Sequence, residues 1–366
     1  MTNKLFIVFL MLLTVGCGSI DKSLSANRIK ATDRRVCYIG RIGTVVGGRV
    51  VYWPGSDVVL RFRGSFLRVK LRETTGKNYF DVIIDSQEVR LFRPKRGTAW
   101  FTVVRGLKYG VHQVQIYKRN EFTNGATYFY GFETDSTGEF LKAQCPKRNI
   151  EFYGNSITVG FADRDSLLLG ERGGIFTDNY VSYGSILSRH YNAGFWCIAR
   201  SGIGLMVSWT GPDMRHLYYR LNPLDSASRW NFSRMEPQLV VINLLQNDYW
   251  LLQRPQYPSV KKRFKGHLPD DKQIVGSYYD FLKSIREHYP NAEIICVLGP
   301  MSVVTSSRWR SYVCSAVAKM RDKRVHYLFL PYLHRNGHPK VRDHRRMAKI
   351  LERYIDSLGI FNRNNK

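Results

Sequence analysis

Apolar and polar residues alternate along much of the first half of the chain. In segment 67–72, Leu, Val and Leu alternate with Arg, Lys and Arg, and segment 112–117 alternates in the same way. A period of two is typical of strands that bury one face. Turn-forming Pro-Gly and Asn-Gly pairs separate these short segments, and no helical pattern interrupts them. We therefore predict an all-β, jelly-roll-like sandwich over residues 34–143.

The second half has a different pattern. Apolar runs without clear alternation occur at 150–153, 195–199, 239–245, 293–298 and 325–330. Between them, apolar residues recur at helical spacing, as Ile274, Tyr278 and Phe281 do. Buried strands divided by amphipathic helices form a parallel sheet with helices on both faces. We predict an α/β domain over residues 148–361.

Three polar residues come soon after predicted strands of this sheet. Ser156 and Asn247 each follow a strand closely, and His338 lies between the last strand and the last helix. Ligands of such sheets bind at the carboxyl ends of the strands. The strand order along the chain therefore predicts that Ser156, Asn247 and His338 meet at one edge.

Ser156 has two interpretations. It stands in a Gly-Asn-Ser turn that would lift a hydroxyl out of the sheet as a nucleophile. Serine in such a turn more often caps the following helix. Thr158 stands where a nucleophile elbow would have its second glycine, which argues against the α/β-hydrolase arrangement.

The turn at Ser156, the Asn247-Asp248 pair and the His338-Pro339 pair, in this order, resemble the SGNH (GDSL-type) esterase superfamily. The resemblance implies a flavodoxin-like, three-layer α/β hydrolase domain.

The resemblance also implies a role for each site residue. Ser156 would be the nucleophile and His338 the general base. The Asn247 side chain would donate to the oxyanion, together with a glycine N–H near Gly204 or Gly202.

The chain departs from the superfamily pattern at three places. Asn155 stands where the family has Asp, and Leu245 replaces a glycine ahead of Asn247. The family also has an Asp two or three residues before the histidine, where this chain has Asn336 and Arg335. We expect Asn336, or a backbone carbonyl, to orient the ring of His338.

The resemblance extends to carbohydrate esterase family 2, in which a jelly-roll-like domain precedes the SGNH domain. The similar strings are 52–56, 78–85, 201–205, 230–234 and 298–301. This implies a serine esterase that removes acetyl groups from polysaccharides such as xylan and mannan, without metal or cofactor.

Two tryptophans follow strands at the predicted active edge. Aromatic rings offer flat apolar faces on which a sugar can stack, although most of them pack into cores. We name Trp250 as the better candidate platform and Trp209 as the second.

The first residues resemble a bacterial lipoprotein signal. Lys4 precedes an apolar run at 5–13, and small residues lead to Cys17. The run is too short for a spanning helix. We predict a signal at 1–17 with lipidation of Cys17, a polar tether at 18–33, and an exported, membrane-anchored monomer. An ordinary signal peptide or an uncleaved anchor is the alternative.

Composition adds two constraints. The formal net charge is +27, and since an exported protein does not normally meet nucleic acid, we expect none as a partner. This charge would attract the protein to acidic envelope material, but a surface rich in Lys and Arg can also serve solubility alone. The cysteines beyond Cys17 have no zinc-like spacing. Cys197 and Cys296 are expected in the core, and disulfides stay open.

Two further functions fit the same pattern. One is an esterase that acts on acetylated cell-envelope glycans, a substrate for which a basic surface would be suitable. The other is a non-catalytic glycan-binding lipoprotein, in which the missing acid marks a degenerate site. The two classes differ in whether Ser156 can be acylated.

Overall fold

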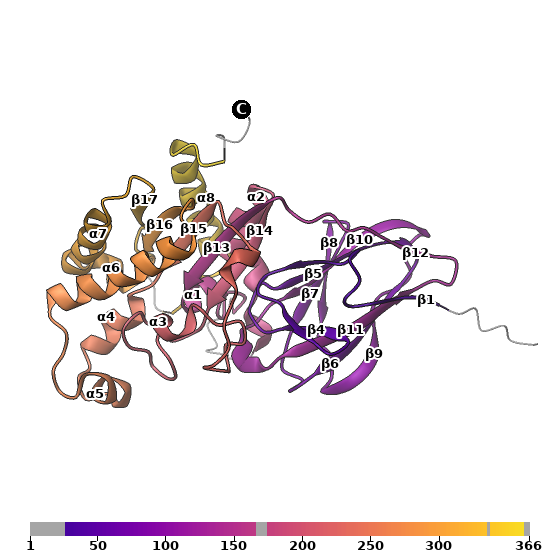
Figure 1. The fold of residues 1–366 in the computed structure, drawn as a ribbon, viewed down its shortest axis with the longest axis horizontal. Coiled ribbons are helices and arrows are strands. Elements are labelled where there is room, and N and C mark those ends of the chain that lie inside the picture. Colours follow the sequence, from indigo (N-terminus) through magenta and orange to yellow (C-terminus); the bar gives the residue numbers. More distant parts are fainter. Residues whose placement is uncertain (1–25, 166–173, 335–336, 362–366) are drawn as a thin grey trace, which may run out of the picture.

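In the computed structural model an all-β part, right in Figure 1, is followed by an α/β part, left, and the two pack side by side. The structure describes residues 26–165, 174–334 and 337–361. Cys17 and Asn336 lie outside the described residues, so their roles stay predictions.

The all-β part consists of two six-stranded antiparallel sheets. The first has the order β3-β4-β11-β6-β9 with β1 beside β11, and the second has the order β12-β5-β10-β7-β8 with β2 beside β5. The strands are β1 (Asn27–Lys30), β2 (Cys37–Ile39), β3 (Gly43–Val45), β4 (Gly48–Val51), β5 (Asp57–Gly64), β6 (Leu67–Glu73), β7 (Phe80–Ile84), β8 (Glu88–Phe92), β9 (Gly97–Val104), β10 (Gly110–Lys118), β11 (Thr127–Thr134) and β12 (Glu139–Leu141).

Burial in this part follows the predicted alternation. In β6, Leu71 is fully buried while its neighbours Lys70 and Arg72 are exposed. Leu71 from the first sheet and Phe80 from the second belong to one hydrophobic cluster between the sheets. Burying each such side chain is worth about 1.5–3 kcal/mol. The all-β prediction is confirmed, and the jelly-roll form of the connections stays a prediction.

The predicted tether at 18–33 is wrong for its last residues. Strand β1 pairs antiparallel with β11, from Asn27 opposite Thr134 to Lys30 opposite Gly131. Only one side chain of this strand, Ile29, is buried. A short strand with one apolar residue resembles a polar linker in sequence, which explains the error.

The predicted parallel sheet is confirmed, with the order β14-β13-β15-β16-β17 and parallel pairing throughout. Its strands are β13 (Arg148–Gly154), β14 (Ala193–Ala199), β15 (Leu239–Asn243), β16 (Glu293–Leu298) and β17 (Val325–Phe329). The helices are α1 (Ser156–Val159), α2 (Tyr183–His190), α3 (Met214–Leu217), α4 (Gln246–Leu252), α5 (Pro258–Phe264), α6 (Asp271–His288), α7 (Ser307–Met320) and α8 (Val341–Ser357).

Helices cover both faces of this sheet, which makes three layers (Figure 1). Ile242 of β15 packs in one hydrophobic cluster with Phe281 of α6. Its neighbour Val241 packs on the other face, in a cluster with Leu351 of α8. Helix α7 joins the first cluster and α2 the second. Alternate residues of one strand thus face the two helix layers, as expected for a sheet buried on both sides.

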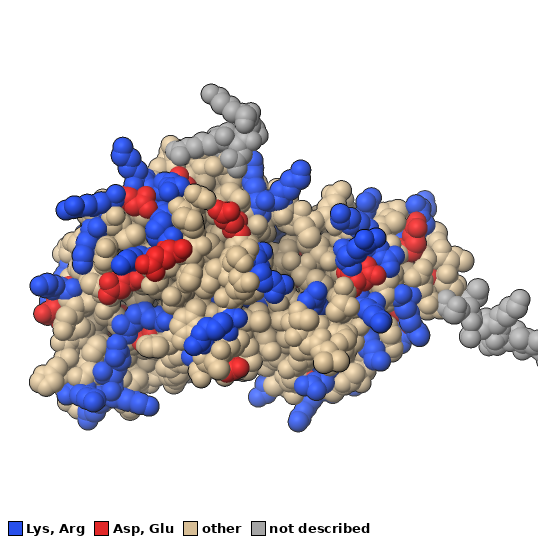
Figure 2. Space-filling view, viewed as in Figure 1, with Lys and Arg blue, Asp and Glu red and all other residues tan. Residues whose placement is uncertain are grey.

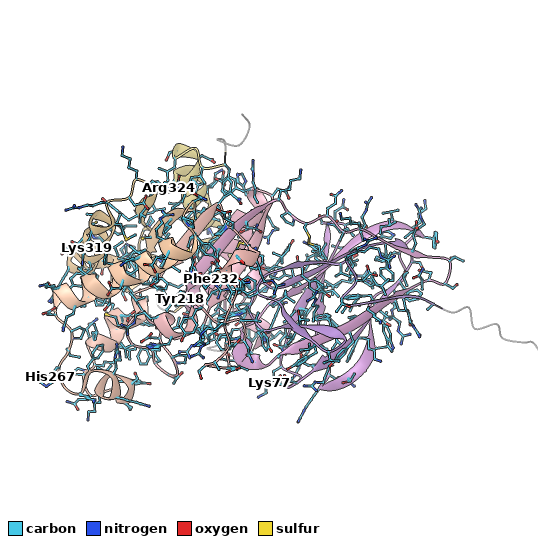
Figure 3. All side chains as sticks on the ribbon, viewed as in Figure 1. Lys77, Tyr218, Phe232, His267, Lys319 and Arg324 are labelled. Atoms are coloured by element: carbon cyan, nitrogen blue, oxygen red, sulfur yellow. A yellow bond between two sulfur atoms is a disulfide. The ribbon has the colours of Figure 1, made fainter. Side chains whose placement is uncertain are left out.

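A buried ion pair and a shared core join the two parts. The side chain of Arg41, 1% exposed, donates to Glu151 of β13 over 3.0 Å and to the carbonyl of Tyr218. Trp53 donates from its indole to the carbonyl of Leu221. Figure 3 places Tyr218 where the all-β part meets the α/β part. An ion pair buried this deeply resists separation because either charge left alone would be costly.

A disulfide joins Cys37 in β2 to Cys145, which follows β12. The sequence gives no sign of this pair because 108 positions separate the two cysteines. Cys197 and Cys296 are buried free thiols, as predicted. None of the helices in the described residues has the length and apolarity needed to cross a membrane.

Candidate active site

Neighbouring strands of the parallel sheet end in one row, and the predicted site residues follow it. Gly154, the last residue of β13, is paired with Ala199 of β14 on one side and with Asn243 of β15 on the other. Ser156 comes shortly after Gly154, and Asn247 shortly after Asn243. The carboxyl edge of the sheet therefore holds both residues, as the strand ends predict.

Ser156 is the first residue of the short helix α1 and not its cap. Asn155 caps the helix, because its side-chain oxygen accepts the N–H of Ile157 over 3.0 Å. The hypothesis that Ser156 serves as a cap is therefore wrong. Its Oγ instead lies 2.8 Å from Nε2 of His338. A hydroxyl held against an imidazole nitrogen can lose its proton to that base as it attacks.

His338 reaches Ser156 from the segment between β17 and α8. The ring of His338 lies 4.9 Å from the ring of Phe161, measured between centroids. The first residue of α8, Val341, donates its N–H to the carbonyl of Asp163 over 3.2 Å. The segment that carries His338 is thereby attached to the segment that follows α1 and its serine.

The side-chain amide of Asn247 is fixed at both ends. Its Nδ2 donates to the carbonyl of Ile203 over 2.7 Å, and its Oδ1 accepts the indole N–H of Trp209 over 2.9 Å. These bonds exclude the flipped orientation of the amide. Since an amide nitrogen carries two hydrogens, one remains to donate to a developing oxyanion.

Leu245 takes a left-handed backbone conformation of the kind that favours glycine. Its φ is 73° and its ψ is −14°, in the left-handed region, directly before α4. This conformation costs a residue with a side chain about 1–2 kcal/mol. The side chain of Leu245 is buried, and that burial offsets the cost. The departure from glycine therefore leaves the turn ahead of Asn247 intact.

We use the name oxyanion loop for residues 201–208. Within it, the N–H of Gly204 donates to Oγ of Ser208 over 3.1 Å, and a Cβ on Gly204 would lie 2.0 Å from the carbonyl oxygen of Val207. Gly202 has a φ of 76°, and in the described residues its N–H has no acceptor. The geometry favours Gly202 as the second oxyanion donor and gives Gly204 a packing role.

A buried carboxylate that the sequence analysis did not single out organises the oxyanion loop. Asp248, 0% exposed, accepts the N–H groups of Leu205, Met206 and Val207 over 2.7, 2.7 and 3.1 Å. Burial raises the pKa of Asp248 to about 6, although these N–H donors act to lower it. One side chain thus fixes three consecutive peptide groups beside Asn247. The adjacent Asn-Asp pair was visible in the sequence, but these acceptor contacts were not.

A second buried carboxylate reaches the same loop from the all-β part. Glu121 accepts the N–H of Ser201 over 2.7 Å, and Ser201 directly precedes Gly202. Burial raises the pKa of Glu121, and the bond from Ser201 opposes that shift. Both Asp248 and Glu121 contact the backbone of the oxyanion loop, which makes them candidate positioning residues.

The two tryptophans differ in their contacts. Trp209 holds Asn247, and its ring meets Tyr257 edge to face with centroids 5.0 Å apart. Trp250 is partly buried, and its indole N–H donates to Oγ of Ser302 over 3.0 Å. Trp209 therefore has a positioning contact that the sequence did not predict. For both residues the role of sugar platform stays a prediction.

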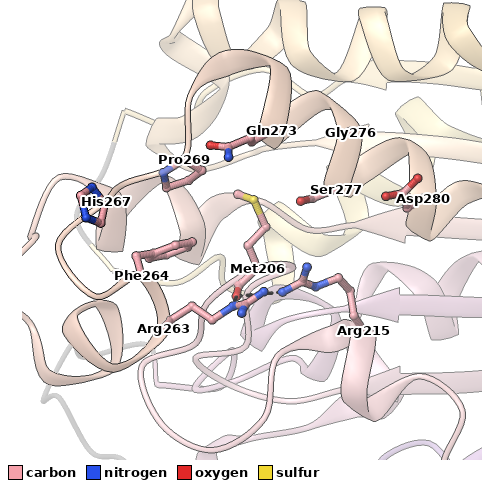
Figure 4. Close-up of a pocket in the computed structure, with 10 residues that line it drawn as sticks. All are labelled: Met206, Arg215, Arg263, Phe264, His267, Pro269, Gln273, Gly276, Ser277 and Asp280. Carbon is pink, nitrogen blue, oxygen red and sulfur yellow. Dashed lines mark hydrogen bonds between the residues drawn. The ribbon is translucent and has the colours of Figure 1, made fainter.

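A cavity of about 360 Å³ borders the oxyanion loop (Figure 4). The carbonyl of Met206 accepts a bond from Arg215 over 3.3 Å and one from Arg263 over 3.2 Å, and both guanidinium groups line the cavity. None of the predicted site residues is among those that line it. The cavity therefore adjoins the site through Met206 without containing its chemistry.

Comparison with known proteins gives matches in sequence. Residues 38–143 match the family described as carbohydrate esterase 2 N-terminal. The cellulase/esterase CelE of Acetivibrio thermocellus is 32% identical over 317 residues, which are 82% of this chain but only 36% of CelE. This chain thus spans well under half of that relative. An acetylxylan esterase / glucomannan deacetylase of Cellvibrio japonicus is 25% identical over 312 residues, 82% of this chain and 83% of that protein.

Solved structures match over nearly the whole described chain. A family two carbohydrate esterase from Clostridium thermocellum, in complex with cellohexaose, has a TM-score of 0.78 and 31% identity, covering 89% of this chain and 99% of that one. A family two carbohydrate esterase from Cellvibrio japonicus has a TM-score of 0.81 and 22% identity, covering 92% and 98%. The second match shows the shared fold alone.

Proposed function

Since this chain belongs to carbohydrate esterase family 2 and is a carboxylic ester hydrolase, we propose that it removes O-acetyl groups from a carbohydrate through an acetyl-Ser156 intermediate. The observation that carries the proposal is the 2.8 Å contact between His338 Nε2 and Ser156 Oγ. In a site built for acyl transfer, this contact joins the nucleophile to its base.

The proposed reaction has two halves. In the first, Ser156 Oγ attacks the acetyl carbonyl carbon, His338 takes the hydroxyl proton, and the sugar oxygen leaves with that proton. In the second, water attacks the acetyl-serine, His338 takes its proton and returns it to Ser156, and acetate is released. The Asn247 amide and the Gly202 N–H would stabilise the negative oxygen in both halves.

The substrate class is proposed from the relatives. The Cellvibrio japonicus relative is named for acetylxylan and glucomannan, and the Clostridium thermocellum structure holds cellohexaose. These names support an acetylated polysaccharide as the substrate, with Trp250 as a candidate platform near the site. An esterase for acetylated cell-envelope glycans is the variant of this proposal that the net charge of +27 would favour.

We further propose that the protein is exported and is held at a membrane through a lipid on Cys17, as a monomer. The Cys37–Cys145 disulfide supports export, because disulfides persist in oxidising compartments.

A second candidate function is glycan binding without turnover. The complex of the Clostridium thermocellum relative with cellohexaose favours this second function, because cellohexaose has no acetyl group to remove. The two functions separate in one experiment, in which acetate release from acetylated xylan and glucomannan is measured beside binding of cellohexaose.

The expected result is acetate release that the variant Ser156→Ala abolishes while its melting temperature stays within a few degrees. Folded protein that binds cellohexaose but releases no more acetate than Ser156→Ala would replace the esterase proposal by the binding one.

A further inference from the structure

The outer face of the first β-sheet carries basic residues in adjoining rows. Strand register places Arg28, Glu133 and Arg68 in one row across β1, β11 and β6. The next row holds Lys30, Gly131, Lys70 and Trp100, and the third holds Tyr128, Arg72 and Thr98. We call Arg28, Lys30, Arg68, Lys70 and Arg72 the basic face. Cross-strand partners lie on the same side of a sheet, so these five cations share one surface.

Aromatic rings hold three of these cations in place. The guanidinium groups of Arg28 and Arg68 lie 5.4 and 5.7 Å from the ring of Trp100, and Arg72 lies 4.5 Å from the ring of Tyr128. A Cβ at Gly131 would lie 3.9 Å from the Trp100 ring, so the indole extends across β6 to this glycine. Side chains fixed in this way lose less entropy when a ligand binds.

The face has far more positive than negative charge. Glu133, whose side chain is 3% exposed, bridges Arg28 over 2.6 Å and Arg68 over 2.7 Å. Among the described residues, Lys30, Lys70 and Arg72 have no carboxylate within ion-pair distance. Figure 2 shows that Lys and Arg are spread over both parts of the visible face of the molecule. The basic face differs from that general charge because strand register aligns its five cations and ring contacts hold three of them, Arg28, Arg68 and Arg72.

We propose that the basic face binds a polysaccharide that carries carboxylate groups, such as a uronate polymer. A guanidinium plane matches a carboxylate in two parallel hydrogen bonds, and the ring contacts hold that plane ready. The cations are two residues apart along β1 and along β6, so each of these strands presents them at intervals of about 7 Å. A chain with regularly repeated carboxylates can engage several of them at once.

A polysaccharide fits this surface better than a membrane or a nucleic acid does. The rings of Trp100 and Tyr128 lie beneath or beside guanidinium groups and are partly buried, so they do not offer an apolar wedge for a bilayer. The face is also part of a carbohydrate esterase, and glycan is the polymer such an enzyme meets. The binding does not depend on hydrolysis, so its test can use protein that cannot turn over.

The test measures binding of Ser156→Ala protein to polygalacturonate, neutral xylan, duplex DNA and anionic phosphatidylglycerol vesicles. The test variant adds Lys30→Gln, Lys70→Gln and Arg72→Gln, the exposed cations of the face that lack a carboxylate. The matched control adds Lys261→Gln, Lys262→Gln and Lys272→Gln, which remove the same charge from exposed positions in α5 and α6.

We expect polygalacturonate to bind more tightly than neutral xylan. The basic-face variant should lose about tenfold or more in affinity for polygalacturonate, which corresponds to about 1.4 kcal/mol of binding free energy. The affinity of the control variant should change less than about twofold. Equal losses in the two variants would reduce the effect to net charge and overturn the proposal. Tighter binding to DNA or to vesicles than to polygalacturonate would also overturn it.

A milder variant tests the role of the guanidinium plane. Arg72→Lys keeps the charge but loses the paired hydrogen bonds and the flat contact with Tyr128. We expect a loss of about threefold for polygalacturonate, with an unchanged melting temperature. No loss at all would show that charge alone accounts for the binding.

Discussion

Ser156, the proposed nucleophile, and the oxyanion loop follow neighbouring strands of one sheet, but different contacts hold them in place. Ser156 is set by a local turn, in which Asn155 caps α1 and leaves the serine hydroxyl to His338. The oxyanion loop is set from outside itself, by Asp248 from α4 and by Glu121 from the all-β part. A local turn can be recognised in a short string of residues, whereas a loop held by distant anions cannot.

This difference implies different sensitivities to mutation. Changes at the Ser156–His338 contact should abolish the chemistry and leave the fold unchanged. Changes at Asp248 or Glu121 should reduce activity in proportion to how far the loop moves.

Replacing His338 by Ala should cause the largest loss after removal of the serine itself. General-base catalysis contributes typically 10²–10⁴-fold, so we expect kcat to fall by at least about a hundredfold. Steady-state kinetics on an acetylated xylan, with circular dichroism to confirm folding, measures this. A folded His338→Ala protein with more than a tenth of the original kcat would assign the base elsewhere.

The variant Asn247→Ala should lower kcat by about 10²–10³-fold, because one oxyanion donor is lost. KM should change little, since the donor acts on charge that develops in the transition state. The comparison variant is Trp209→Phe, which keeps an aromatic ring but removes the indole N–H that bonds to the Asn247 amide. It should lose about tenfold or less. A folded Asn247→Ala protein that lost no more than about tenfold in kcat would show that the amide is not the donor.

Replacing Asp248 by Asn should lower kcat by about tenfold, because one carboxylate oxygen becomes an N–H₂ group facing loop N–H donors. Retention of full activity would mean that the loop keeps its shape without the anion.

The pH dependence of the loop provides a separate test of Asp248. Its pKa is raised to about 6 by burial, so the folded protein takes up this proton before the unfolded chain does. As pH falls from 7 to 5, this group therefore adds to the free energy of unfolding, while its bonds to the loop weaken. Hydrogen exchange should therefore show that the backbone amides of residues 205–207 lose protection as the pH is lowered through about 6. Protection that stays constant across this range would contradict the assignment.

The variant Glu121→Gln should have the smallest effect, about two- to fivefold in kcat, because the glutamine carbonyl can still accept the Ser201 N–H. Glu121→Ala should lose about tenfold, since the N–H is then left without its acceptor. Equal activity of the two variants and the parent protein would show that the all-β part has no part in shaping the loop.

Much of the fold could be predicted from the sequence. Alternation over 67–72 gave a strand with one buried face, and the apolar runs gave every strand of the parallel sheet. Ser156, Asn247 and His338 could be named because residues after parallel strands share an edge.

The remainder depends on contacts between distant residues. Cys37 and Cys145 pair across 108 positions, and Glu121 reaches Ser201 from another sheet. The preference for Gly202 over Gly204 as the candidate donor rests on the bond from the Gly204 N–H to Ser208. Leu245 shows that a leucine can hold a glycine's conformation where its side chain is buried. No periodic pattern or motif spacing in the sequence reveals any of these contacts.

A covalent acetyl-Ser156 intermediate can be detected by locating the acetyl group on the protein during turnover. The protein would be mixed with p-nitrophenyl acetate, quenched in acid within milliseconds to seconds, digested and examined by mass spectrometry. The proposed mechanism predicts one acetyl group on the peptide that contains Ser156, with a burst of nitrophenol equal to the enzyme concentration, and neither in Ser156→Ala. Turnover that persists in Ser156→Ala, or an acetyl group found on another residue, would contradict it.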